Sequence, residues 1–171
     1  MKFIVGLIVG FLVIPLSIYF YFRFGYAPVA TAASPIPFER YLAGLGLHAR
    51  INHEYPRNIP FKATDNDLQN GAHLYRQHCA ACHGLPSNPK TATAKGMYPD
   101  PPQLFEGKGV TDDEAGETYW KLANGIRLTG MPAYRGNISD HDMWAISELL
   151  AGADKLPADV KTILSEPVHE P

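Results

Sequence analysis

The chain has 171 residues, with 15 Lys or Arg, 17 Asp or Glu and a net charge of −2 at pH 7. This length suits one modest domain with appendages, and the near balance of charges excludes a uniformly basic protein built to bind nucleic acid. Residues 1–63 carry six basic and two acidic residues (net +4) and residues 64–171 carry nine and fifteen (net −6), which predicts a basic stalk before an acidic domain.

The first predicted element is a membrane-spanning helix. Residues 3–22 contain no charged side chain, and about twenty apolar residues are enough to cross a bilayer as a helix. A cleavable signal peptide is the alternative, with residues 30–32 (Ala-Thr-Ala) as its cleavage site. However, the apolar run is longer than a signal-peptide core, and aromatic residues cluster over residues 19–26 as they do at membrane interfaces. We expect residues 1–25 to be a retained anchor that contacts the lipid bilayer through residues 3–22.

Residues 26–63 are expected to form a spacer. Five prolines between residues 28 and 60 interrupt this stretch too often for one long helix. A shorter helix is predicted over residues 38–53, where several apolar side chains partly follow a helical period. His48 and His53 lie in this segment, and we interpret both as surface or packing residues rather than metal ligands.

A capping signal at residues 64–67 (Thr-Asp-Asn-Asp) begins a helix that leads to the motif Cys79-Ala-Ala-Cys82-His83. Two thiols with two residues between them and an adjacent histidine form the attachment site of a c-type haem, because each thiol bonds one vinyl group and the imidazole reaches the iron. A zinc site would need four Cys or His ligands, and the sequence has no third cysteine. A thioredoxin-like dithiol would follow a strand rather than a helix. The motif therefore predicts one covalently bound haem c.

Two more helices are predicted after the motif, over residues 111–125 and 139–152. No stretch of the sequence alternates as a β-strand would. We therefore expect an all-α haem domain over residues 64–156, in which three main helices pack around the porphyrin. The C-terminal tail, residues 157–171, is expected to contain at most a short helix at residues 158–164.

The order of these motifs resembles a class I, single-haem cytochrome c over about residues 65–152. The resemblance is carried by Gly71-x-x-Leu74-Tyr75, Cys79-Ala-Ala-Cys82-His83-Gly84, Gly125-Ile126, Gly130-Met131-Pro132-Ala133-Tyr134, and a closing helix with Trp144 and Leu149. In that family the first and last helices cross at a small residue. The resemblance therefore implies that Gly71 lies opposite Trp144 or Leu149.

The resemblance also implies a methionine as the sixth iron ligand. Met1 is the start of the chain and Met143 belongs to a helix core, so Met97 and Met131 are the candidates. We expect the ligand to be Met131, which lies in a loop like the family's ligand loop, whereas Met97 is expected nearer the turn that supports the proximal side. The segment 99–104 resembles the one whose proline carbonyl accepts a hydrogen bond from the ligating histidine, which implies Pro101 or Pro102.

Iron held by His83 and Met131 has no open position, so the expected activity is single-electron transfer, with no catalysis and no small-molecule substrate. We expect a membrane-anchored electron carrier, or an electron-transfer subunit of a respiratory or photosynthetic membrane complex. Its expected location is a bacterial inner membrane, with a single span and the haem domain on the periplasmic side, where haem is attached covalently. The acidic domain predicts an integral-membrane redox partner with a basic docking patch. The alternatives are a haem enzyme or sensor with a displaceable methionine, an assembly protein with a structural haem, and a cleaved, soluble periplasmic cytochrome.

Overall fold

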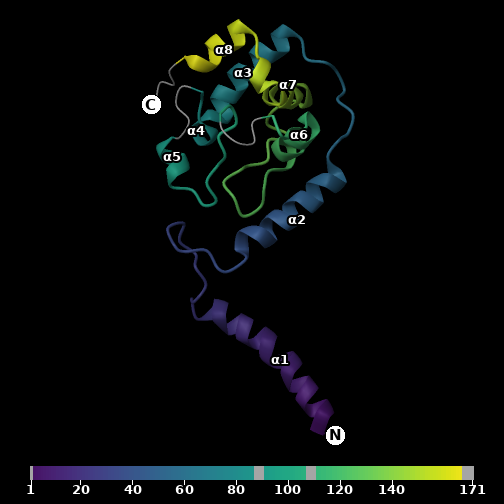
Figure 1. The fold of residues 1–171 in the computed structure, drawn as a ribbon, viewed down its shortest axis with the longest axis vertical. Helices are drawn as coiled ribbons and strands as arrows, with labels where there is room; N and C mark the ends of the chain where they lie inside the picture. Colours follow the sequence, from purple (N-terminus) through teal and green to yellow (C-terminus); the bar gives the residue numbers. More distant parts are fainter. Residues whose placement is uncertain (1, 87–90, 107–110, 167–171) are drawn as a thin grey trace. The chain divides into compact units, whose positions relative to one another are not determined.

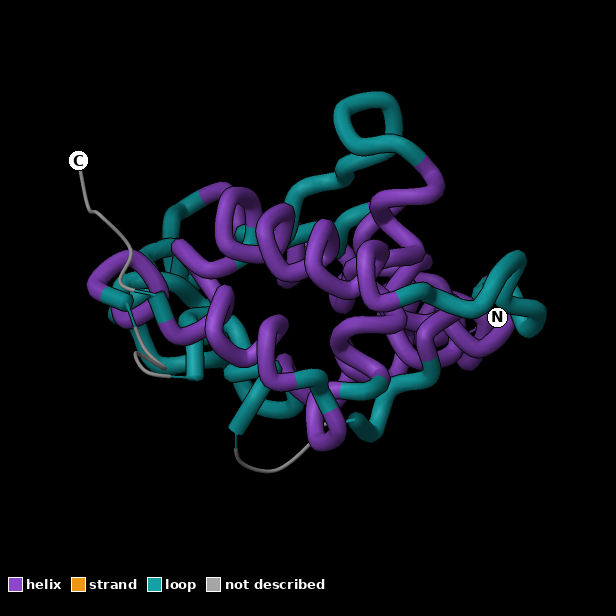
Figure 2. Tube along the Cα trace, turned by 90° about the horizontal axis from the view of Figure 1, so that it is seen from above, coloured by secondary structure: helices purple, strands orange, loops and turns teal. Residues whose placement is uncertain are grey.

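The structure is a computed structural model that describes residues 2–86, 91–106 and 111–166. Within these ranges the backbone forms eight α-helices and one 3-10 helix, and it contains no β-strand. Figures 1 and 2 draw the helices and the loops that join them. The all-α prediction is therefore confirmed. The chain divides into two compact units, Met1–Leu42 and Ala43–Pro171, and each is described by itself.

The first unit contains helix α1, Lys2–Arg23, which includes Pro15. Its large apolar side chains are exposed along the helix, for example Phe3 and Phe11. Of the helices in the described residues, α1 alone is long and apolar enough to cross a membrane, a test that a signal sequence also passes. The predicted span, residues 3–22, falls within α1.

Helix α2, Glu39–Glu54, continues into the second unit, and its C-terminal half is part of that unit's core. Ile51 and Tyr55 are only 2% and 5% exposed. A Cβ atom on Gly116, at the start of helix α6 (Ala115–Asn124), would overlap the carbonyl oxygen of Pro56. The segment that follows α2 therefore lies directly on α6, although the sequence assigned these residues to a spacer.

Helices α3, Asp65–His78, and α7, Asp140–Ala151, cross at Gly71. A Cβ atom on Gly71 would lie 2.8 Å from the carbonyl oxygen of Ala145, so the absence of a side chain allows the two backbones to approach. The predicted crossing is present, but its partner is the backbone of Ala145 rather than Trp144 or Leu149. The Trp144 ring stacks instead on Tyr119 of α6, with 4.4 Å between ring centres, and Leu149 is buried in the hydrophobic core.

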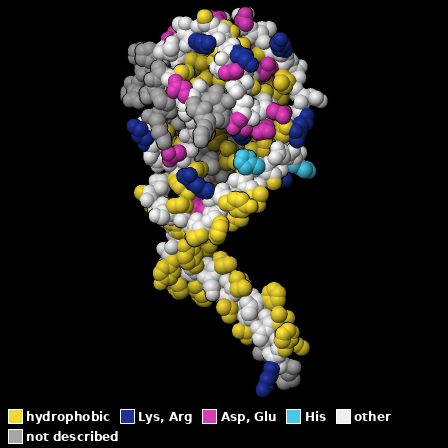
Figure 3. Space-filling view, viewed as in Figure 1, with side chains coloured by type: hydrophobic (Ala, Val, Ile, Leu, Met, Phe, Trp, Pro, Cys, Tyr) yellow, Lys and Arg dark blue, Asp and Glu magenta, His cyan; other side chains and the backbone are white. Residues whose placement is uncertain are grey.

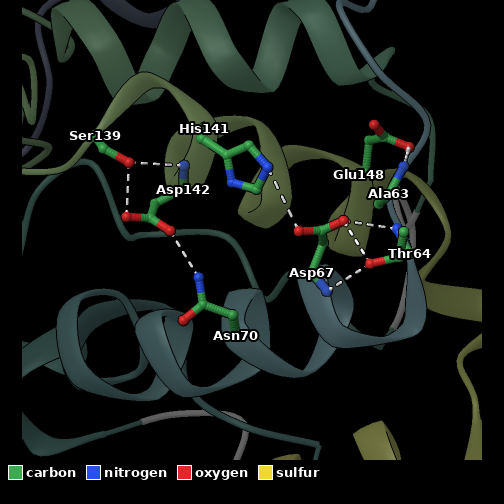
Figure 4. A network of polar contacts seen from close by, with 8 residues as sticks. All are labelled: Ala63, Thr64, Asp67, Asn70, Ser139, His141, Asp142 and Glu148. Atoms are coloured by element: carbon green, nitrogen blue, oxygen red, sulfur yellow. Dashed lines mark hydrogen bonds and ion pairs between the residues drawn. The ribbon is translucent and has the colours of Figure 1, made fainter.

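A polar network joins the start of α3 to α7 (Figure 4). Thr64 and Asp67 form the predicted capping box, in which each side chain accepts a hydrogen bond from the other residue's backbone N–H. The Asp67 carboxylate also lies 3.5 Å from Nε2 of His141 on α7. The Asn70 amide donates to Asp142, which caps α7 together with Ser139. These contacts fix the register of the two helices at the crossing.

The predicted tail contains a helix that is part of the core. Helix α8, Ala158–Ser165, follows the 3-10 helix Ala153–Lys155, and its residues Val160 and Leu164 are buried against α3. The guanidinium of Arg76 on α3 donates a hydrogen bond to the carbonyl oxygen of Ile163 at 2.9 Å. The expected short helix at residues 158–164 is confirmed, and it packs on the haem unit.

Candidate haem site

The Cys-x-x-Cys-His motif forms one helical turn. Helix α3 ends at Cys79, whose N–H donates to the Tyr75 carbonyl, and the short helix α4, Ala80–His83, continues from it. The N–H groups of Cys82 and His83 both donate to the Cys79 carbonyl, at 3.0 and 2.9 Å. The turn ends at Gly84, whose φ of 75° favours glycine. One turn of helix therefore presents both thiols and the imidazole together.

The ring of His83 is oriented by a hydrogen bond to the loop that follows the haem motif. Its Nδ1 atom lies 2.8 Å from the carbonyl oxygen of Pro102. Because a carbonyl oxygen can only accept, Nδ1 carries the proton and Nε2 keeps a lone pair for a metal. Burial lowers the pKa of His83, against the opposing effect of the Pro102 hydrogen bond, so the ring is neutral at pH 7. Of the two prolines that the sequence left open, Pro102 is the hydrogen-bond acceptor.

The predicted site residues line one cavity of about 350 Å³. They are Cys79, Cys82, His83, Met131, Pro101 and Pro102, and the apolar side chains of Leu104, Leu122, Ile126 and Leu150 line the same cavity. Burial, with a smaller effect of Cys82, raises the pKa of the Cys79 thiol to about 12. A redox-active dithiol has a lowered thiol pKa instead, so the cavity does not suit that alternative.

The loop that carries Met131 is held against the end of α6. Gly125 has a φ of 66°, and a Cβ atom there would lie 2.7 Å from the backbone nitrogen of Ala133. The Ile126 N–H donates to the Met131 carbonyl at 3.1 Å, and the Met131 N–H donates to the Thr129 hydroxyl at 3.0 Å. These bonds fix the backbone of Met131, which is one of the residues that line the cavity.

Met97, the other candidate ligand, also lines the cavity, but it does so from beside the Met131 loop. A Cβ atom on Gly130 would overlap the Cε methyl group of Met97. We expected Met97 nearer the proximal turn, and the structure places it against Gly130 because a residue without a side chain leaves room for the methyl group there. The glycine at position 130 is the feature of the sequence that permits this contact, but it does not show which residue lies against it.

Two residues that the sequence analysis treated as spacer line the cavity as well. They are Leu47 and His48 on α2. His53, on the same helix, is not among the described lining residues. The available signal was the spacing of Leu47, Ile51 and Tyr55, which places three apolar side chains on one helix face. The prolines on either side of α2 obscured this pattern.

Charged side chains from α6 and the loop before it also reach the cavity. Lys121 forms an ion pair with Asp113, and both line the cavity together with Asp112. Burial, together with the nearby Asp113 carboxylate, raises the pKa of Glu117. Figure 3 shows acidic side chains grouped on this face of the second unit, beside a hollow in its surface. The cavity therefore opens next to negative charge.

These groups fit a covalently bound haem. Two thiols on one helical turn, a neutral imidazole with a free Nε2 and a methionine line one largely apolar cavity, and the two thiols and the imidazole are the groups that attachment of a c-type haem requires. Residues 66–150 match the family model described as cytochrome c oxidase, cbb3-type, subunit III. A search of curated proteins finds no match. From the donor set and this match together, residues 66–150 are a class I c-type cytochrome domain, which binds haem c covalently.

Proposed function

We propose that this chain is a membrane-anchored, single-haem cytochrome c that transfers one electron at a time, with the iron held between His83 and Met131. The observation that carries the proposal is that both residues line the cavity next to Cys79 and Cys82, with Nε2 of His83 free to bind a metal. The sequence contains one Cys-x-x-Cys-His motif and no other cysteine, which supports one haem per chain.

The bound haem supplies the redox chemistry, since its iron changes between the ferrous and ferric states. The chain's residues hold the group and set its environment. The imidazole of His83 is kept in one tautomer by Pro102, and the thioether of Met131 is a neutral ligand that raises the reduction potential. His83 and Met131 together would leave the iron no position for a substrate, and we therefore infer an electron carrier rather than an enzyme.

We place the haem unit on the periplasmic side of a bacterial inner membrane, attached by α1. The length and apolar character of α1 support the anchor, and covalent haem attachment supports the periplasmic side. The family model that matches residues 66–150 is described as an oxidase subunit. We therefore propose an integral-membrane redox complex as the partner, and the acidic residues Asp112, Asp113, Glu114 and Glu117 near the cavity favour a basic docking patch on it.

The test uses the full chain, expressed in a host that attaches haem c and extracted with detergent. The expected result is one covalently bound haem per chain, the weak red absorption band of a ferric iron–thioether bond, and no binding of carbon monoxide. Carbon monoxide binding by the unaltered ferrous protein would overturn the carrier in favour of a haem enzyme or sensor. Recovery of the chain in the soluble periplasmic fraction, shortened at its N-terminus, would overturn the anchor.

The partner is identified by what co-purifies with the native, detergent-extracted protein. We expect an integral-membrane redox complex whose association weakens as salt is added, because the docking surfaces carry opposite charges. A chain that co-purifies with no redox protein at low salt, and that exchanges electrons with none in membranes, would contradict this part of the proposal.

A further inference from the structure

Helix α2 supplies part of the haem cavity although it precedes the residues that match the family model. Its C-terminal half is fixed by packing: Ile51 is 2% exposed, and Gly116 lies against Pro56. The Glu54 carboxylate accepts a hydrogen bond from the Trp120 indole at 3.2 Å. The position of His48, on the preceding turns of the same helix, is therefore set by the folded core.

The covalent attachment limits which part of a haem can reach α2. The two vinyl groups and the two propionates lie on opposite halves of the porphyrin, so bonds to Cys79 and Cys82 would direct the propionates away from α4. Figure 1 draws α4 and the second-unit part of α2 well apart, with the cavity-lining loops between them. A haem bonded to both thiols would therefore have its propionates on the side of the cavity away from α4, and Leu47 and His48 on α2 line the cavity on that side.

A propionate at this end needs a hydrogen-bond donor. Asp112 and Asp113 offer only acceptors when ionised, and Lys121 is already paired with Asp113. His48 is exposed at the cavity edge, and its ring makes no hydrogen bond to any residue that the structure describes. If His83 and Met131 held the iron, an imidazole from α2 would meet the edge of the porphyrin rather than its iron.

We propose that His48 donates a hydrogen bond to a haem propionate and so makes α2 part of the haem-binding site. The inference rests on the proposed function, because it requires the haem bound through Cys79, Cys82 and His83. Its consequence is that part of the propionate's negative charge is balanced by a side chain from outside the matched domain, which favours the ferrous state.

The experiment compares His48→Leu with His53→Leu in the full, haem-loaded chain. His53 is a matched control because it lies on the same helix, is exposed, and is absent from the described cavity wall. The readouts are the reduction potential and the propionate bending band in the resonance Raman spectrum. We expect His48→Leu to lower the potential and shift the propionate band, and His53→Leu to change neither. His48→Gln, which keeps a donor, should recover part of both effects.

Two outcomes would overturn the inference while leaving the proposed function intact. One is a His48→Leu protein whose potential and propionate band equal those of the unaltered chain. The other is loss of the iron's sixth ligand in His48→Leu, which would make His48 an axial ligand instead. Failure of the proposed function is distinguishable, because it would appear in the unaltered protein as a missing haem or a missing iron–thioether band.

Discussion

The Nδ1 atom of His83 and the carbonyl oxygen of Pro102 lie 2.8 Å apart, and this contact connects the haem motif to the loop that follows it. A backbone acceptor cannot be removed by changing a side chain, so the orientation of the imidazole depends on the path of the loop itself. Burial lowers the pKa of His83, so the neutral ring that binds a metal is the form present at pH 7.

Met131→Ala and Met97→Ala should have different effects, although both residues line the cavity. Met131→Ala is expected to open the sixth position, abolish the iron–thioether band, permit carbon monoxide binding and lower the reduction potential. Met97→Ala should leave the band in place and destabilise the protein by about 1 kcal/mol, because it removes packing against Gly130. A band lost only in Met97→Ala would reverse the ligand assignment.

Gly71→Ala should destabilise the haem-loaded protein by about 1–3 kcal/mol in chemical denaturation. The added Cβ would lie 2.8 Å from the Ala145 carbonyl oxygen, so α3 and α7 would have to separate. Gly46→Ala on α2 is the control, because a Cβ there meets nothing within 4 Å and alanine is the better helix former. We expect that change to be neutral or stabilising, and equal destabilisation by both variants would contradict the crossing.

Thr64→Ala should remove the capping box of α3 and cost about 1 kcal/mol at neutral pH. Hydrogen bonds from Thr64 hold the pKa of Asp67 below its usual value. A carboxyl whose pKa is lowered on folding stabilises the protein above its unfolded pKa of about 4, and that stability is lost as pH falls below it.

The prediction is checked by denaturation between pH 7 and pH 2. Thr64→Ala should lose less additional stability in acid than the unaltered protein, because Asp67 then has a more nearly normal pKa. Thr162→Ala is the control, since its exposed hydroxyl donates a hydrogen bond to the Ala158 carbonyl of its own helix. An acid dependence unchanged by Thr64→Ala would show that Asp67 does not contribute.

The double variant Cys79→Ala, Cys82→Ala should be largely unfolded when it carries no haem. The helices surround a cavity of about 350 Å³, and without the porphyrin its apolar walls pack against nothing. Far-ultraviolet circular dichroism measures the loss of helix. A helical signal equal to that of the haem-loaded protein would contradict this prediction.

Features that depend on residues close together in the chain could be predicted from the sequence. The caps at Thr64 and Ser139 and the end of α7 at Gly152 lie where expected, because each depends on residues three or four positions away. The haem motif is equally local, since one helical turn brings Cys79, Cys82 and His83 together. Helix α6 begins at Ala115 rather than at the expected residue 111. Its N-cap residue, Glu114, makes no side-chain hydrogen bond, so no capping pattern in the sequence marked the true start of the helix.

Contacts between distant residues could not be read in this way. The choice of Pro102 over Pro101 depends on how a loop passes the His83 ring, and neighbouring prolines have the same carbonyl chemistry. The packing of α2 depends on Gly116, more than sixty residues after Ile51. The contact of Met97 with Gly130 likewise joins two loops that only the complete fold brings together.

Helix α8 has a consequence for any shortened version of this protein. Val160 is 0% and Leu164 is 1% exposed, so both belong to the interior as fully as Tyr75 does. A chain that ended directly after the matched domain, at residue 150, would expose an apolar surface of α3 to solvent, and this would promote aggregation. A soluble fragment for crystallisation or electrochemistry should therefore extend through Ser165 and begin no later than Ala43, where the compact unit starts.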